Sequence, residues 1–497
     1  MSNVKRDYVN QFPETTGNLH SRTQVLAEFV AGFDYERLPE KVVLETKRLL
    51  VDTLAAGFAG AAAKCSRINL EIADLFGGAP QASVIGQKVS RPFPLAGMVN
   101  AKMANALDFD DCYMNVAHFA PQTVFGALAA GEYAQISGKR LIAAVALGYD
   151  VAARICLSFM FWRVRRGLLT TRGSRQVYAA NAFAAMASAA HALRLTTQNL
   201  KNAFGNCGHF APCLTRSIMT VAPCDEMNKY CDAGWSTHTG IMAALFGWKG
   251  YKSSHYVLDG RDGYAAVMDI DHPDNEKLTE HLGEKWHILD AAFKTYPCCK
   301  YTHAPLEAFA ELADEHRLCP EDVQRINVYV RPSHAVGFSA RELPEDSDMP
   351  FTHNLPLNFA KVIYHIPLNA EWHETGHLRN ARIRDFMKKV FVYPAGEALV
   401  TGVEDVYACG FPKEIPATVE ILTKDKTYKR DKKRAKGDPW WGETRLSDQE
   451  LFAKLSRCIR GSLPPADSAR LFDLVMQLEK EDNLAEIGIL FKKYAPT

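Results

Sequence analysis

The sequence has almost no charge imbalance. Its 497 residues carry 58 Lys and Arg against 57 Asp and Glu, which gives a formal net charge of +1. Such a chain has no bulk electrostatic attraction for nucleic acid or for an anionic membrane. We therefore expect neither nucleic acid nor a membrane among its partners, and any anion that it binds must be held by a local arrangement of residues.

Long uninterrupted apolar runs are also missing. The first twenty residues, MSNVKRDYVNQFPETTGNLH, are polar and lack the apolar core of a secretory signal. The longest apolar segment, LIAAVALGYDVAARICLSFMFW, is interrupted by Asp150 and Arg154, so it predicts a buried helix rather than a membrane span. These features predict a cytoplasmic protein, with an organelle matrix as the alternative.

Cysteine is present, but not in the patterns of a disulfide scaffold or a zinc site. Twelve cysteines are few for a chain of this length, so we expect reduced thiols. No CxxC pair occurs, whereas structural zinc sites usually have two. Ligand-like spacing occurs twice, in Cys207, His209 and Cys213 and in Cys298, Cys299 and His303. Small buried thiols are the favoured interpretation, and we expect no metal and no cofactor.

Helical periodicity dominates the first 290 residues. Apolar or alanine-rich helical patterns occupy residues 22–33, 38–61, 123–132, 141–159, 177–195 and 238–248. The small side chains in the later patterns allow helix axes to approach closely, which suits a compact multi-helix core. No rhythm of strand, glycine-rich turn and helix appears in this part of the chain, and GLLTTRGSRQ is not a phosphate loop.

The pattern changes near residue 290. QRINVYVRPS alternates Ile326, Val328 and Val330, which predicts a half-buried strand. PATVEILTKDKTYKRDKK predicts a hairpin with a charged turn, and two helical patterns lie among these strands. Residues from about 291 to 440 therefore predict a smaller α+β unit.

Helical patterns return after residue 440. Ser447 and Glu450 have the spacing of a capping box at the start of DQELFAKLSRCIRG. The C-terminal helices can complete the first helical domain, which would then be discontinuous, formed by residues 1–290 and 441–497.

A basic run, KDKTYKRDKKRAKGDPWW, ends in two tryptophans. Aromatic side chains beside cations can stack on nucleic-acid bases. Interleaved aspartates at positions 425, 431 and 438 favour a solvated face of the hairpin instead.

An acidic cluster precedes a histidine in ALDFDDCYMNVAHFAPQ. Asp108, Asp110 and Asp111 lie within four residues, and three carboxylates so close repel one another unless they are solvated or meet cations. One interpretation is a capped helix end with a surface histidine. The other pairs Asp108 or Asp111 with His118, which would orient the imidazole and raise its basicity for proton transfer.

Two lysines stand beside turns rather than in charged helices. Lys229 lies in CDEMNKYCDAGW, and Lys294 begins KTYPCCKYTH. Single lysines usually lie on the surface, so the pattern alone does not assign them a function.

Four segments together resemble the MmgE/PrpD family. NALDFDDCYMNVAH, MNKYCDAG, KTYPCCKYTHAPLEAF and KGDPWWGETRLSDQELFAKL occur in the family's order, and the similarity runs from about residue 25 to 490. The family includes 2-methylcitrate dehydratase, cis-aconitate decarboxylase and iminodisuccinate epimerase. The resemblance implies a mainly α protein, with a large helical domain from both chain ends and an inserted α+β lid at residues 291–440. It also implies a site between the two, a homodimer, and cofactor-free chemistry on small polycarboxylates.

The resemblance also assigns site residues. By position, the catalytic set is His118, Asp108, Lys229 and Lys294, and the substrate-binding set is Arg175, Asp111, Cys112, Cys299 and His303. Three positions depart from the family pattern: Arg175 is near the place of a histidine, Leu357 near that of a tyrosine, and Cys112 where threonine is common. An arginine can bind a carboxylate but cannot transfer a proton near neutral pH.

The expected reaction is the dehydration of a 2-methylcitrate- or alkylcitrate-like hydroxy acid. His118 would act as acid and base, while lysines aimed at a substrate carboxylate would stabilise the developing enediolate-like charge. Decarboxylation and epimerisation share this carbanion-like intermediate and stay open. So does a diverged paralogue that acts on a less anionic substrate.

Overall fold

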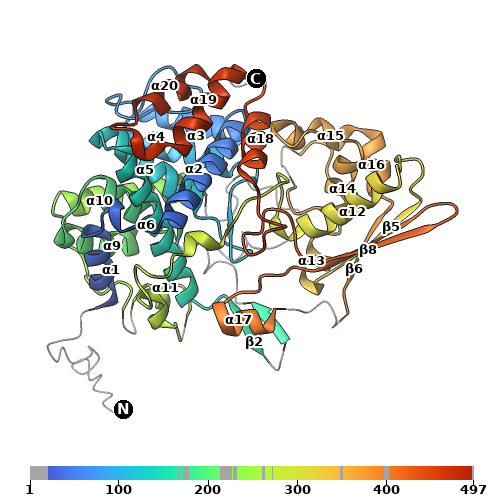
Figure 1. Cartoon of the computed structure of the whole chain (residues 1–497), viewed down its shortest axis with the longest axis horizontal. Helices are drawn as coiled ribbons and strands as arrows, with labels where there is room; N and C mark the ends of the chain where they lie inside the picture. The colour runs from blue at the N-terminus through green and yellow to red at the C-terminus, as the bar shows by residue number, and fades with distance from the viewer. Residues whose placement is uncertain are drawn as a thin grey trace, which may run out of the picture.

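The computed structural model describes residues 21–165, 168–171, 178, 180–212, 227, 232–259, 263–270, 272–347, 351–396 and 402–494. Within these ranges the chain is mainly α-helical, and its strands form three small sheets (Figure 1). The expected mainly α class is thereby confirmed.

The helical body joins both ends of the chain. Its N-terminal helices are α1 (Arg22–Ala31), α2 (Glu40–Gly60), α3 (Lys64–Phe76), α4 (Phe93–Asn105), α5 (Ala120–Ala134), α6 (Gly138–Ser158), α8 (Asn181–Ala192), α9 (Thr197–Phe210), α10 (Ala233–Trp248) and α11 (Tyr264–Val267). The C-terminal helices are α18 (Asp448–Cys458), α19 (Pro465–Met476) and α20 (Ala485–Lys493). Helices α18 and α19 pack on α2, and one hydrophobic cluster runs from Leu26 to Tyr494 (Figure 1).

Alanine and glycine set the close packing at the centre of the body. Helix α8 packs against α5, α6 and α10. A Cβ atom at Gly240 of α10 would lie 2.3 Å from the carbonyl oxygen of Ala182, and one at Gly148 of α6 would lie 2.7 Å from that of Ala184. Larger side chains would force these helices apart, which is the close approach expected from the alanine-rich patterns.

Helix α6 is the apolar segment predicted to be a buried helix. In the described ranges it is the single helix that is long and apolar enough to cross a bilayer, and its apolar window lies wholly inside the body. The two charged residues within its apolar segment pair with each other, Arg154 Nε donating to Asp150 Oδ2 over 2.6 Å. The helix ends at Ser158, one residue before the end of the predicted pattern, and an unexpected hairpin of β2 (Trp162–Arg165) and β3 (Leu168–Thr171) follows.

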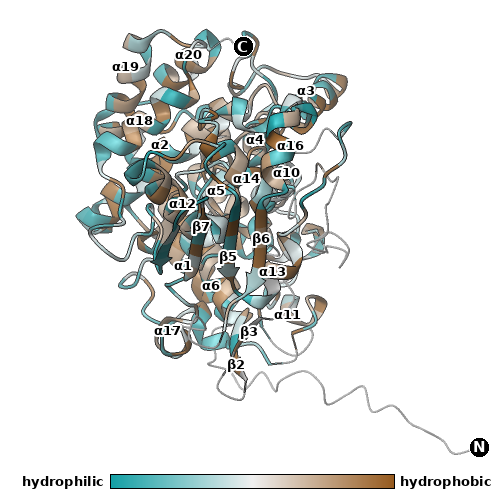
Figure 2. Cartoon of the chain, turned by 90° about the vertical axis from the view of Figure 1, so that its right-hand side faces the viewer, coloured by the Kyte–Doolittle hydropathy of each residue, from teal (hydrophilic) through white to brown (hydrophobic). Residues whose placement is uncertain are grey.

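A four-stranded sheet organises the smaller unit. Its order is β6-β5-β7-β8, formed by β6 (Val390–Pro394), β5 (Arg325–Val330), β7 (Ala417–Leu422) and β8 (Thr427–Lys432). Strand β5 runs parallel to β6 and antiparallel to β7, and β7–β8 is the predicted hairpin. The predicted strand is confirmed, because Ile326, Val328 and Val330 alternate as buried residues. Figure 2 shows β5, β6 and β7 side by side.

Several helices belong to this smaller unit. Of these, α12 (His303–Glu315), α13 (Pro332–Gly337) and α14 (Leu355–Ile363) contact the strands directly, and α15 (Gly376–Arg379) and α16 (Ala381–Met387) follow α14. Helix α17 (Val403–Cys409) instead contacts β2 of the hairpin. The 3-10 turn η6 (Lys300–Thr302) precedes α12, and η7 (Ala370–His373) lies between α14 and α15 along the chain. A second hydrophobic cluster, from Cys298 to Ala435, holds the unit together.

The basic run lies on β8 and just beyond it. Arg430 pairs with Glu311 at 3.1 Å and with Glu315 at 2.5 Å, and Lys432 pairs with Glu307 at 3.0 Å. These carboxylates belong to α12, so local ion pairs neutralise much of the positive charge.

Candidate active site

The acidic cluster lies in a buried loop between α4 and α5. A two-residue sheet anchors the loop, since β1 (Cys112–Tyr113) pairs antiparallel with β4 (Ala291–Ala292). All three aspartates are fully buried, and His118 is only 4 % exposed. The interpretation as a solvated loop with a surface histidine is therefore wrong, and the cations that three buried carboxylates require must come from elsewhere in the chain.

Lys294 supplies one of these cations. It follows β4 by two residues, and its buried ammonium pairs with the carboxylate of Asp108 and donates to the carbonyl oxygen of the same residue over 2.9 Å. Asp108 has a φ of 55°, the left-handed conformation, which presents both groups to one lysine. The charges of Asp108 and Asp110 outweigh burial and raise the pKa of Lys294, so this lysine stays charged.

Asp110 is the carboxylate that pairs with the histidine. Its Oδ2 lies 3.5 Å from Nδ1 of His118 and accepts a hydrogen bond of 3.0 Å from Asn105. The expected partners were Asp108 or Asp111. The carboxylate of Asp108 binds Lys294 but also has an oxygen within 4.8 Å of the imidazole, whereas both oxygens of Asp111 bind groups of the body. Burial, aided by the charge of Lys294, lowers the pKa of His118 despite its acidic neighbours, so the expected rise in basicity is not found.

Asp111 fastens the start of α5. Its Oδ1 accepts from the backbone N–H of Ala120 over 3.0 Å, and its Oδ2 accepts from the hydroxyl of Tyr149 over 2.8 Å. Burial and the charge of Asp110 raise the pKa of Asp111 to about 7. Asp111 thus caps the start of α5, as the interpretation of the acidic cluster as a capped helix end expected. Both of its carboxylate oxygens accept hydrogen bonds from groups of the helical body.

A second buried ion pair, formed by helices α18 and α2, anchors the same loop. Lys454 of α18 pairs with Asp52 of α2 at 2.7 Å and donates to the carbonyl oxygen of Phe109 over 2.8 Å. The C-terminal helices therefore hold the loop that carries Asp108 and Asp110 in place.

Three further predicted residues lie buried near the same loop. Cys112 is in β1, opposite Ala292, and its pKa is raised well above the ordinary value by burial. Burial likewise raises the pKa of Cys299 to about 12. His303 begins α12, with Nδ1 3.4 Å from the hydroxyl of Thr295, and burial holds its pKa well below the usual range. These two thiols are protonated and the imidazole is neutral near pH 7.

Lys229 and Arg175 lie outside the described residues. Of the described neighbours of Lys229, the carbonyl of Met227 and the carboxylate of Asp232 both bind Lys102 of α4, at 2.5 and 2.7 Å. Beyond Arg175, the ring of Tyr178 stacks on that of His118 with centroids 6.4 Å apart.

Leu357 is buried on α14, and its backbone N–H donates to the side-chain oxygen of the capping residue Asn354 over 2.8 Å.

One group of donors could hold a metal ion in the described part of the chain. Ligand atoms of Asp108, Asp110 and His118 lie within 4.8 Å of one another. The ammonium of Lys294 already neutralises Asp108, and a second cation beside it would be repelled. The cysteine sets with ligand-like spacing form no such group among the described residues, and Cys213 is not one of these.

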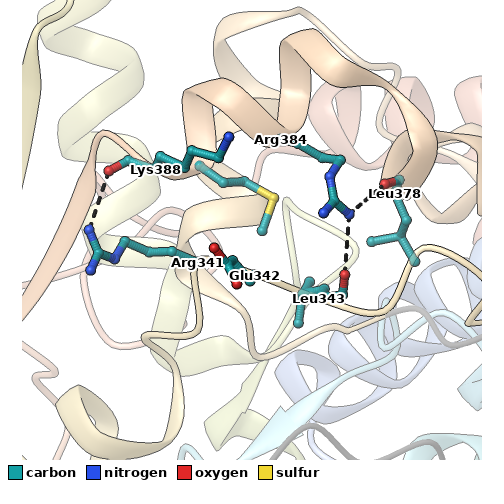
Figure 3. A pocket seen from close by; sticks show the side chains of 7 residues that line it. Arg341, Glu342, Leu343, Leu378, Arg384 and Lys388 are labelled. Atoms are coloured by element: carbon teal, nitrogen blue, oxygen red, sulfur yellow. Dashed lines mark hydrogen bonds between the residues drawn. The ribbon is translucent and has the colours of Figure 1, made fainter.

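A shallow pocket in the smaller unit lies apart from these residues (Figure 3). Arg384 donates to the carbonyl oxygens of Leu343 and Leu378 over 3.3 Å each, and Arg341 donates to that of Lys388 over 3.5 Å. These bonds tie a loop to α16, and none of the predicted site residues lines the pocket.

Sequence reasoning left several site residues without a role. Asp110 belonged to the recognised cluster, but nothing in the pattern indicated which carboxylate faces the imidazole. Asp52 and Lys454 are separated by 402 residues, so no local signal pairs them. Tyr178, whose ring stacks on that of His118, lies in none of the four segments that carry the resemblance.

Two family profiles match this chain. The MmgE/PrpD N-terminal domain matches residues 24–276, and the MmgE/PrpD C-terminal domain matches residues 296–480. The chain belongs to the MmgE/PrpD family. The resemblance read from the four segments is therefore confirmed. The acidic loop lies within the range matched by the first profile, and Lys294 lies between the two matched ranges.

Similar proteins in this family carry the name of a decarboxylase. The chain is 24 % identical over 344 residues to the cis-aconitate decarboxylase of Aspergillus terreus, covering 65 % of this chain and 67 % of that protein. It is 26 % identical over 320 residues to that of Homo sapiens, covering 62 % and 64 %. It is 25 % identical over 313 residues to the cis-aconitate decarboxylase of Mus musculus, covering 61 % of each chain. The matches thus span about two thirds of these relatives or less.

Proposed function

We propose that this protein is a cofactor-independent lyase that acts on a small polycarboxylate, with His118 as the proton-transfer group. The observation that carries the proposal is the buried imidazole, 3.5 Å from Asp110 and beside the buried pair of Lys294 and Asp108. Membership of the MmgE/PrpD family and relatives that are named as enzymes support the same class.

The electrostatics suit abstraction of a proton next to a carboxylate. Because its pKa is lowered, His118 is neutral near pH 7 and can accept a proton, and the carboxylate of Asp110 stabilises the imidazolium that results. Lys294 stays charged and can stabilise negative charge that develops on the substrate. Together these groups favour a carbanion-like intermediate in a water-poor site.

Dehydration of an alkylcitrate-like hydroxy acid is the reaction that the sequence favoured. Decarboxylation is the second candidate, and the names of the relatives support it. Both reactions pass through the same kind of intermediate. They differ in the bond that breaks, a C–O bond in the first and a C–C bond in the second.

We further propose that residues 291–440 act as a lid, that the active form is a homodimer, and that the protein works in the cytoplasm. Support for the lid comes from η7, where Nε2 of His373 lies 3.0 Å from the carbonyl oxygen of Leu107, next to the acidic loop. The same smaller unit carries Cys299 and His303, and their position there supports a site between the two units.

Proton NMR in D₂O tests the function. Purified protein is incubated with 2-methylcitrate, cis-aconitate and a substituted succinate, and His118→Gln is compared with His281→Gln, a change at a histidine whose side chain is 68 % exposed. New vinylic product signals should appear with the wild type and fall by roughly 10²- to 10⁴-fold in His118→Gln alone.

Other outcomes would redirect the proposal. Deuterium incorporation without a new product would indicate an epimerase or isomerase of the same family. Silence with all three acids would contradict the polycarboxylate lyase and favour the diverged paralogue.

A further inference from the structure

Arg331 connects the smaller unit to the helical body. It precedes α13 at the end of β5, and its guanidinium carbon lies 5.0 Å from the centroid of the Trp162 ring in β2. The side chain is partly buried, and this burial lowers its pKa. Stacking on an indole orients the planar guanidinium but does not neutralise its charge.

No carboxylate of the described chain pairs with Arg331. The tyrosine Tyr301 is the one titratable group whose negative form would act on it, and a neutral phenol carries no charge near pH 7. Arginines that leave water are usually paired, because an uncompensated cation is costly to desolvate. A guanidinium in this situation is ready to pair with an anion from outside the chain.

His334 stands beside this cation with an unused polar atom. His334 follows Arg331 by three residues and is 9 % exposed. The centroid of its ring lies 4.1 Å from that of Tyr301 and 5.0 Å from that of Phe338. Its Nδ1 is buried and has no hydrogen-bond partner among the described residues. Burial and the charge of Arg331 lower the pKa of His334 to about 3, so the ring is neutral and one of its nitrogens carries a hydrogen to donate.

Aromatic rings link this pair to the acidic loop. Tyr301 follows Cys299 by two residues, and the pKa of its phenol is raised by burial and by the thiols of Cys299 and Cys112. Tyr178, which stacks on His118, has its own pKa raised by burial and by Tyr301. The rings of Tyr301 and Tyr178 therefore lie between His334 and the imidazole of His118, with Tyr301 against the first and Tyr178 against the second.

We propose that Arg331 and His334 form a subsite for a carboxylate group of the substrate, remote from the carbon at which proton transfer occurs. A guanidinium binds a carboxylate through two parallel N–H donors, and the imidazole adds a third. This inference rests on the proposed function, because it assigns the second carboxylate of the same polycarboxylate. The substrate class that it names is a di- or tricarboxylate long enough to reach from His118 to α13.

Isothermal titration calorimetry tests the subsite by measuring the affinity for acids that cannot undergo the reaction. The probes are tricarballylate, with three carboxylates, and butyrate, which has one. Wild type should bind tricarballylate more tightly than butyrate. Arg331→Met should weaken tricarballylate binding by roughly 10- to 100-fold and remove most of the preference for it. Arg331→Lys keeps the charge without the paired donors and should fall between the two, and His334→Phe should lose a few-fold.

Arg325→Met is the matched control. Arg325 lies on the same strand and stacks on Phe391 at 3.8 Å, but on the outer face of the sheet. Thermal unfolding of each variant confirms that it is folded. Equal tricarballylate affinity in wild type, Arg331→Met and Arg331→Lys would overturn the subsite and leave the proposed function standing. A wild type that binds neither acid would overturn both, and a loss of equal size in Arg325→Met would assign the effect to the sheet rather than to the subsite.

Discussion

The two sides of the candidate active site handle buried charge differently. On the side of the helical body, buried carboxylates meet cations from distant segments: Asp108 pairs with Lys294, and Asp52 with Lys454. These pairs are complete within the chain. They need no ligand to balance them, and their main consequence is a rigid loop beneath His118.

On the side of the smaller unit, some buried basic groups lack such partners. Lys300 pairs with Asp438 at 2.8 Å, but Arg331, His334 and Lys361 face no carboxylate among the residues that the structure describes. Unpaired basic groups are complementary to an anion, whereas Lys294 and Lys454 are already matched by carboxylates. The proposed carboxylate subsite would thus use the smaller unit, and the proposed proton transfer the loop of the body.

The largest expected effect comes from removing the cation of a buried ion pair. Lys294→Met leaves the carboxylate of Asp108 buried without its cation, so the free energy of unfolding should fall by about 3–5 kcal/mol. Urea denaturation followed by circular dichroism measures this change. The double variant Asp108→Asn with Lys294→Met should recover much of the loss, because it removes the stranded charge. A single variant within about 0.5 kcal/mol of wild type would contradict the completed pair.

Local patterns predicted much of the fold. The alternation of Ile326, Val328 and Val330 identified β5, and the spacing of Ser447 and Glu450 identified the capping box that opens α18, where both reciprocal hydrogen bonds are present. The predicted pattern at residues 141–159 ends one residue after α6, but the β2–β3 hairpin was missed, because the buried Phe161 and Trp162 continue the apolar run. Apolar character reports burial, and it does not distinguish a helix end from a strand start.

The site was less accessible to sequence reasoning. The resemblance brought Asp108, His118 and Lys294 together, and the structure places them around one buried loop. Which aspartate meets which partner depends on the left-handed backbone at Asp108, with φ of 55°, and no pattern of residue types specifies that angle. The contact of Lys454 with the acidic loop and the surroundings of Arg331 and His334 result from tertiary packing, which no local sequence pattern predicts.

An intermediate effect is expected at Lys361, which is 1 % exposed on α14 with its ammonium 5.4 Å from the centroid of Trp372. Burial lowers its pKa from 10.5 to about 7. The unfolded chain then binds more protons than the folded one between pH 7 and about 10.5, so this lysine destabilises the fold fully below pH 7 and not at all above about pH 10.5.

Lys361→Met should therefore raise the free energy of unfolding by about 3 kcal/mol at pH 6, and the gain should fade as the pH rises toward 10. Thermal unfolding across this pH range measures it, with Lys424→Met in an exposed turn as the control. A gain that does not depend on pH would attribute the effect to packing and would weaken the contrast between the two sides.

The smallest effect is expected at Asp111, a buried carboxylate of the body that, like Asp110, pairs with no lysine or arginine among the described contacts. Its pKa is about 7 in the folded protein against 3.8 in the unfolded chain, so the folded state binds more protons between these values. The stabilisation is complete below pH 4 and is lost as the pH rises through 7.

Asp111→Asn keeps an acceptor for Ala120 or Tyr149 and cannot titrate. The substitution should lower the free energy of unfolding by about 1 kcal/mol at pH 5. The decrease should be smaller at pH 8, because the wild-type carboxylate is then charged and its burial already destabilises the fold. Urea denaturation at the two pH values measures this difference, and Asp425→Asn in the exposed turn should show none. If the cost instead grows with pH, the charged form of Asp111 is the stabilising one, and a cation must balance it as Lys294 balances Asp108.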